Sequence, residues 1–259
     1  MLWKLLKYDF RSIWRQFAII WPAALVLALA NRFTLPLADH NLPSSAGGNS
    51  ILVTVTMSVF VGVLCAMVVV SMIFIIKRFY QGLLGDEGYL MHTLPVKTWQ
   101  LVAAKLICAV VVTAINTVVA VLSMFLLVPI QWVELFNWKI WKMLFHGLAQ
   151  HPDTILYVIE VALLALAVLV FGLTTLYLSM AIGHLFQRRR VLMSVAAFFV
   201  IDILCNVVTD AMDRWGLLNI QLDTTAHASI WICILFMAVP ASLFFAGTSY
   251  ILKHRLNLE

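Results

Sequence analysis

The polar and acidic residues that could bind a substrate lie in and directly after one apolar stretch, residues 191–212. Asp202 lies near the middle of this stretch, and Asn206, Thr209 and Asp213 follow it at i+4, i+7 and i+11. This spacing places all four on one face of a helix. An acidic side chain at the centre of a membrane helix costs about 2.5–3.5 kcal/mol by insertion scales. We interpret the four residues as the lining of a path through a membrane or as a contact between subunits; the alternative is a protonated or hydrogen-bonded aspartate that locks the fold.

Patterns typical of a catalytic centre do not occur in the sequence. It holds neither HExxH nor GxSxG, and because the dipeptide Gly-Lys never occurs, it holds no GxxxxGK[ST] loop for nucleotide phosphates. The four cysteines stand apart within apolar stretches and are expected to be buried thiols rather than metal ligands: Cys65, Cys108, Cys205 and Cys233. We therefore expect no enzyme active site, cofactor site or metal site in this chain.

Composition predicts that lipid surrounds most of the chain. Hydrophobic residues make up 63% of the sequence and charged residues 11%, against about half and about a quarter in soluble domains. The apolar residues form blocks long enough to cross about 30 Å of hydrocarbon, and in lipid such blocks must be helices. The fold class is therefore an all-α integral membrane protein with six expected spans: 17–37, 51–76, 100–128, 154–182, 191–212 and 228–252.

The distribution of basic residues predicts the orientation of these spans. Of the 17 lysines and arginines, 13 fall on one side: in residues 1–16, the loop after the second span, the start of the third span at Lys105, the loop after the fourth span and the C-terminal end. The remaining four are Arg32, Lys139, Lys142 and Arg214. Because short basic loops stay in the cytoplasm, a multi-pass protein of the cell membrane with both termini cytoplasmic is expected. The net charge of +5 thus reflects topology and contact with membrane lipids, and no nucleic-acid partner is expected.

Residues 1–16 have the pattern of an amphipathic helix at the membrane interface. Basic residues recur at helical spacing on one face, at Lys4, Lys7, Arg11 and Arg15. The other face carries Leu2, Leu6, Phe10, Ile13 and Phe17. The alternative is a signal peptide cleaved after residues 28–30, which would leave five spans. We favour the uncleaved interfacial helix, followed by one transmembrane domain over residues 17–259.

The segment 77–99 is the largest expected cytoplasmic loop. Asp86 and Glu87 suit the start of a short helix, whose apolar face would comprise Leu90, Met91 and Leu94, and Pro95 ends it. Such a helix is suited to docking a soluble partner; the alternative is an ordinary connecting loop.

Residues 86–96, Asp-Glu-Gly-Tyr-Leu-Met-His-Thr-Leu-Pro-Val, followed by Leu101, Val102 and Lys105, resemble the segment after the second span of ABC-2-type permeases. These permeases are membrane subunits of ATP-binding cassette exporters, and their plan of an interfacial helix and six spans is similar to the one expected here. The resemblance implies a type V exporter-like fold, a second permease copy or a related permease as partner, and a separate ATPase subunit that binds ATP and Mg²⁺. It also implies a coupling helix that docks on this ATPase: Gly85, Asp86, Glu87, Gly88, Tyr89, Leu90, Met91 and Leu94.

The resemblance thus leads us to expect a permease that exports an amphipathic or lipid-like substrate, such as a drug, an antimicrobial peptide or a lipid. An ion-coupled secondary transporter is the main alternative; several acids within the spans and broken helices would favour it, whereas the sequence shows one clear mid-span acid, Asp202. A membrane-embedded enzyme would require a nucleophile with its base, or a set of metal ligands, and the sequence patterns supply neither.

Overall fold

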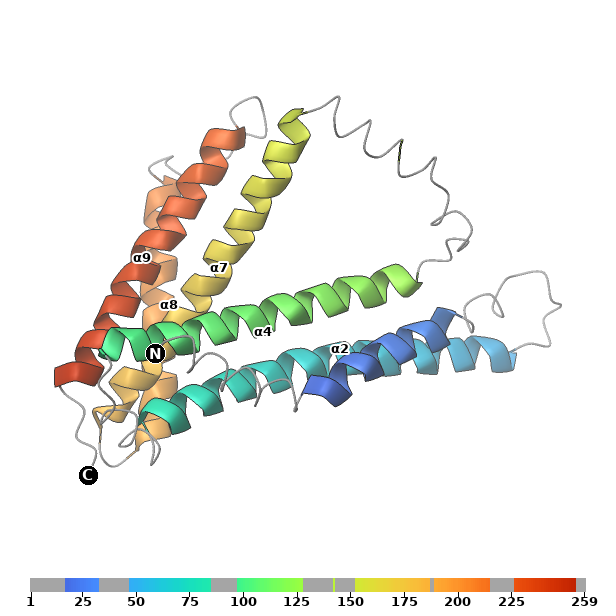
Figure 1. Ribbon diagram of the computed structural model, residues 1–259, viewed down its shortest axis with the longest axis horizontal. Coiled ribbons are helices and arrows are strands. Elements are labelled where there is room, and N and C mark those ends of the chain that lie inside the picture. Colours follow the sequence, from blue (N-terminus) through green and yellow to red (C-terminus); the bar gives the residue numbers. More distant parts are fainter. Residues whose placement is uncertain are drawn as a thin grey trace. The chain divides into compact units, whose positions relative to one another are not determined.

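The computed structural model describes residues 17–32, 47–84, 97–127, 142, 152–186, 189–214 and 226–254. These residues are almost entirely helical and include no strand. After the helix Phe17–Arg32 come α2 (Gly47–Phe79), the π-helical turn η2 (Tyr80–Leu84), α4 (Thr98–Leu127), α7 (Pro152–His184), α8 (Arg190–Arg214) and α9 (Ala226–His254) (Figure 1). The expected interfacial helix 1–16 lies outside the described residues.

Five of the helices are long and apolar enough to cross a membrane, and they correspond to the last five expected spans. The helix Phe17–Arg32 is apolar but shorter, and residues 33–37 of its expected span lie outside the described part. Large apolar side chains cover the outer faces; Ile203, Leu204 and Val207 of α8 are each 59% exposed. Monomeric soluble proteins rarely expose such continuous apolar surface. The described chain is thus compatible with a multi-pass helical membrane protein.

Residues at the ends of the helices account for where several of them begin and end. Pro152 opens α7, at a position where a missing backbone N–H costs nothing. Basic side chains occupy the last turns of α2, α8 and α9, where they interact favourably with the negative end of the helix dipole.

The helical part of the second span is longer than the sequence predicts. The expected loop was to begin at residue 77, but α2 continues to Phe79 and η2 extends it to Leu84. The expected boundary at residue 76 is therefore wrong. Hydropathy locates only the apolar part of a helix, whereas this one continues through Lys77 and Arg78.

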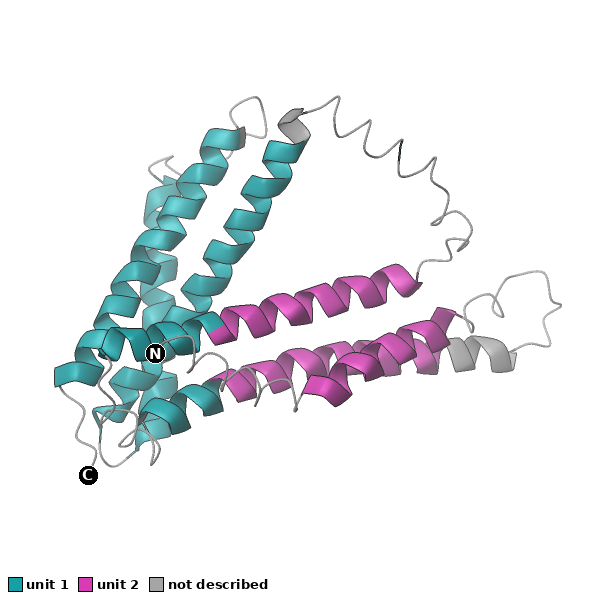
Figure 2. Cartoon of the chain, viewed as in Figure 1, with its two compact units in different colours: residues 1–2, 76–107, 141–259 teal, residues 3–75, 108–140 magenta. Residues whose placement is uncertain are grey.

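The chain divides into two compact units (Figure 2). The second unit holds the helix Phe17–Arg32 and the larger parts of α2 and α4. Phe17, Trp21, Met67 and Cys108 belong to its apolar core.

Inside this core, Asn116 links three helices. It accepts a hydrogen bond from Trp21 Nε1 at 2.6 Å and donates one to Ser71 Oγ, which itself donates to the Met67 carbonyl. Asn116 and Ser71 are buried. Polar side chains commonly join helices in membranes in this way.

The first unit holds the start of α4, the end of α2 with η2, and α7, α8 and α9. Both α8 and α9 pack along α7, and α7 and α9 run side by side in Figure 1. Tyr177 of α7 is 2% exposed; it stacks on Phe79 at a centroid distance of 4.0 Å and donates a hydrogen bond to the Lys105 carbonyl. The helix α7 is therefore the central element of this unit.

Candidate functional site

A hollow of about 850 Å³ lies between α8 and α9. Residues of these two helices line it, together with Phe171 of α7. We call it the α8–α9 hollow. All of its lining belongs to the first unit. A cavity of this size is within the range that takes a small organic ligand.

The polar wall of the hollow is the stripe that starts at Asp202. Asp202 stands midway along α8, and Asn206 and Thr209 line the hollow beside it. The Asn206 side-chain amide donates to the Asp202 carbonyl at 2.9 Å and to its Oδ2 at 3.2 Å, while Thr209 donates to the Cys205 carbonyl at 2.8 Å. These hydrogen bonds all stay within α8, so they leave the outer side of the stripe facing the hollow.

The opposite wall comes from α9 and is apolar. It includes Leu235, Val239 and Leu243, while the Phe171 and Phe244 rings lie 5.9 Å apart between centroids. Pro240 also lines the hollow from inside α9. Since proline has no backbone N–H, it cannot supply the usual helical hydrogen bond to the residue 236 carbonyl. The hollow is therefore mostly apolar, and Asp202, Asn206 and Thr209 place polar groups on its α8 side.

The structure brings together three of the four residues that the stripe predicts. Asp213 is exposed, and it stands one residue before the end of α8 and outside the lining of the hollow. Asp202 is exposed as well, and its hydrogen-bond partner among the described residues is Asn206 of its own helix. Such an arrangement does not tie α8 to another helix, so it gives no support to an aspartate that locks the fold of this chain.

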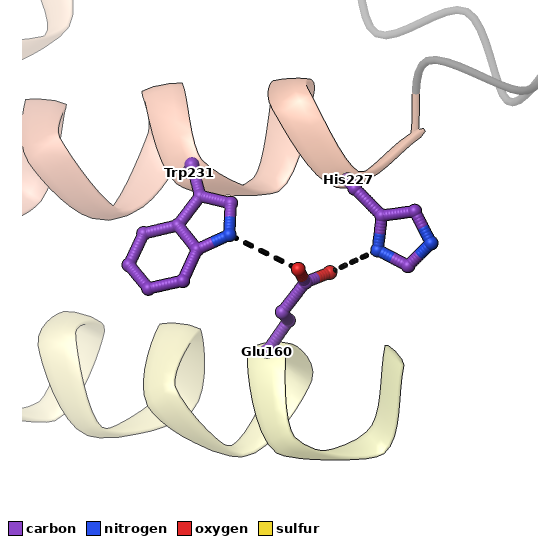
Figure 3. Close-up of polar contacts among 3 residues, drawn as sticks. All are labelled: Glu160, His227 and Trp231. Carbon is purple, nitrogen blue, oxygen red and sulfur yellow. Dashed lines mark hydrogen bonds and ion pairs between the residues drawn. The ribbon is translucent and has the colours of Figure 1, made fainter. Parts of the chain in front are cut away.

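A second polar cluster, which the sequence patterns did not single out, joins α7 to α9 (Figure 3). Glu160 is 8% exposed. One of its carboxylate oxygens lies 2.6 Å from His227 Nδ1, and the other accepts a hydrogen bond from Trp231 Nε1 at 3.0 Å. The Tyr157 ring packs edge-on against His227. The sequence signal that could have identified this cluster is an acid within one apolar stretch, Glu160, and a histidine and a tryptophan four residues apart at the start of another, His227 and Trp231.

The expected coupling residues cannot be compared with the structure, because residues 85–96 lie outside its described part. The cysteine prediction is wrong in part. Only Cys108 is buried by the protein, whereas Cys205 and Cys233 are half-buried and Cys65 is exposed. Apolar surroundings in the sequence do not distinguish burial by other helices from contact with lipid.

Among the residues that the structure describes, no three His, Cys, Asp or Glu side chains gather as metal ligands would. Comparison of the sequence with family models and with curated proteins, and of the fold with solved structures, finds no match.

Proposed function

We propose that this chain is the transmembrane permease subunit of an ATP-binding cassette exporter of the ABC-2 type. It moves an amphipathic or lipid-like substrate across the cell membrane, and a separate subunit hydrolyses ATP to drive the movement. The observation that carries the transport part of the proposal is the α8–α9 hollow. An apolar wall facing a mid-helix stripe of Asp202, Asn206 and Thr209 suits a substrate that has both an apolar body and a polar group.

The ATPase part of the proposal is supported by the resemblance of residues 86–96 to the coupling segment of these permeases. In this arrangement both termini and the loop after η2 face the cytoplasm, where the ATPase binds. The apolar residues Leu90, Met91 and Leu94 pack into a groove of the ATPase, and ATP and Mg²⁺ remain on that partner. A second permease copy, or a related permease, completes the path.

Co-purification of an ATPase with the tagged chain from its native membranes tests this proposal. Burying a leucine contributes about 1.5–3 kcal/mol, so Leu90→Asp should weaken docking at least about tenfold and abolish substrate-stimulated hydrolysis. His92→Asp is the matched control, because at helical spacing residue 92 falls away from the face of Leu90 and Leu94. If the Leu90→Asp variant still retains the ATPase, and if substrate still stimulates hydrolysis, the assignment of the coupling segment is wrong.

An ion-coupled secondary transporter is the second candidate, and Glu160 is the observation that favours it. Glu160 adds a buried acid within a membrane-span helix, and Pro240 interrupts the hydrogen bonds of α9 beside the hollow. If no ATPase accompanies the unaltered chain, and if the purified chain in vesicles accumulates substrate in response to a proton gradient alone, this second function replaces the first.

A further inference from the structure

We infer that the α8–α9 hollow binds a cationic amphiphile, a molecule with a positively charged nitrogen and an apolar chain. This inference rests on the proposed function, because it names the class of substrate that the permease would carry. It follows from the charge and position of the residues on the two walls of the hollow.

The first step concerns charge. Asp202 is the acidic residue of the lining, and none of the residues that line the hollow is basic. The Asn206 side-chain amide donates one hydrogen bond to the Asp202 carboxylate, at 3.2 Å. Between apolar walls, a cation close to a carboxylate interacts with it more strongly than it would in water. Because the lining contains no such cation, a positively charged ligand is suited to take that position.

The second step concerns the other groups near Asp202. The Asn206 and Thr209 side chains use their N–H and O–H donors within α8, so the groups that remain to them are oxygen acceptors. The Phe171 and Phe244 rings, which also line the hollow, can attract a cation through their π faces. Acceptors and aromatic rings both favour a cationic group over an anionic one.

The third step concerns the apolar part of the ligand. Leu235, Val239 and Leu243 of α9 line the wall facing the stripe and are 56–64% exposed. An alkyl or aromatic body would cover them while its charged end lies at Asp202. A second hollow of about 590 Å³, between α4, α7 and α9, has an apolar lining without a charged residue. It therefore offers no equivalent site for a cationic group.

The experiment measures binding of two fluorescent probes to the purified chain in nanodiscs of neutral phosphatidylcholine, without an ATPase. One probe carries a dodecyl chain and a trimethylammonium group, and the other carries the same chain and a sulfonate group. The trimethylammonium charge does not titrate, so a change in binding reports on the protein. We expect the chain to bind the cationic probe at least about tenfold more tightly than the sulfonate probe.

Asp202→Asn should remove this preference, because it keeps the size of the side chain and deletes the charge. Asp210→Asn is the matched control, since Asp210 is exposed on α8 but does not line the hollow; it should leave both affinities unchanged. Val239→Phe should weaken both probes by filling the apolar wall. Thermal unfolding of each variant confirms that it is folded.

Equal binding of the two probes by the unaltered chain overturns the inference, as does an Asp202→Asn variant that keeps the preference. Cross-linking of two copies through Asn206→Cys in a background without other cysteines also overturns it, because a second chain then closes the hollow. None of these results depends on an ATPase, so failure of this inference and failure of the proposed exporter function are distinguishable.

Discussion

Glu160 accepts hydrogen bonds from two residues that stand one helical turn apart on α9. Each of its oxygens contacts a different partner, His227 or Trp231, so one carboxylate fixes both the distance and the register between α7 and α9 near their N-terminal ends. Hydrogen bonds between membrane helices typically contribute about 0.6–2 kcal/mol each.

The first prediction at the residue scale concerns this cluster. Glu160→Leu leaves the donor of Trp231 without its acceptor and should cost about 1–3 kcal/mol of stability. Glu160→Gln keeps an oxygen acceptor at this position and should cost less. Thermal unfolding in detergent, followed by tryptophan fluorescence, measures both. If the Glu160→Leu protein melts at the same temperature as the unaltered chain, the cluster does not hold α7 and α9 together.

Individual residues differ in how well the sequence alone predicts their roles. The stripe of Asp202, Asn206 and Thr209 follows from helical periodicity, since all three lie on one helix. The contact of Glu160 with His227 joins residues 67 positions apart, and no local pattern determines which face of one helix meets which face of another. For the same reason the stripe predicted polar residues on one face but not the apolar wall of α9 opposite them.

At the scale of elements, α7 and α8 approach closely where Gly183 faces Ser194. A Cβ atom at residue 183 would overlap the backbone and the hydroxyl of Ser194, and Gly183 is buried. Small residues at such points allow membrane helices to pack with their backbones close together. The close approach of α7 and α8 at Gly183 and Ser194 therefore tolerates no added atom.

The second prediction follows from this contact. Gly183→Ala should push the two helices apart and cost about 1–3 kcal/mol. Gly172→Ala is the matched control on the same helix, because a Cβ there meets nothing within 4 Å and alanine favours a helix by up to about 1 kcal/mol. Melting temperature and the yield of monodisperse protein compare the two. Equal behaviour of both variants would show that α7 and α8 do not need their close approach.

Helix type was predictable for the long described helices but not for the π-helical turn η2, and the ends of the helices were not predictable. Each long helix extends past the expected apolar span at its ends, as α7 does from Pro152 to His184 against an expected 154–182. The exception is α4, which begins earlier than expected, at Thr98, but ends one residue early, at Leu127. Polar and basic residues continue a helix beyond the hydrocarbon, so hydropathy underestimates its length.

At the scale of the whole molecule, the third prediction tests the orientation of the spans. The bias of 13 basic residues against four places residue 97 in the cytoplasm and the loops around residues 45 and 150 outside. In a background without native cysteines, an impermeant thiol reagent added to intact cells should label Ser45→Cys and Gln150→Cys and should not label Lys97→Cys. The Lys97→Cys chain should react once the membrane is opened, which controls for its expression. Labelling of residue 97 in intact cells would show that the predicted orientation of the spans is wrong.

The wide turn η2 at Tyr80–Leu84 gives the end of the second span a property that an ordinary α-helix lacks. A π turn accommodates one more residue than an α turn. If the turn tightened to α geometry, the chain beyond it would rotate by about 100° and advance by about 1.5 Å. A Cβ added at Gly82, within this turn, would lie 3.2 Å from the end of the Lys105 side chain, which would have to shift slightly to make room. A change between π and α geometry at this turn would therefore couple rotation to axial displacement.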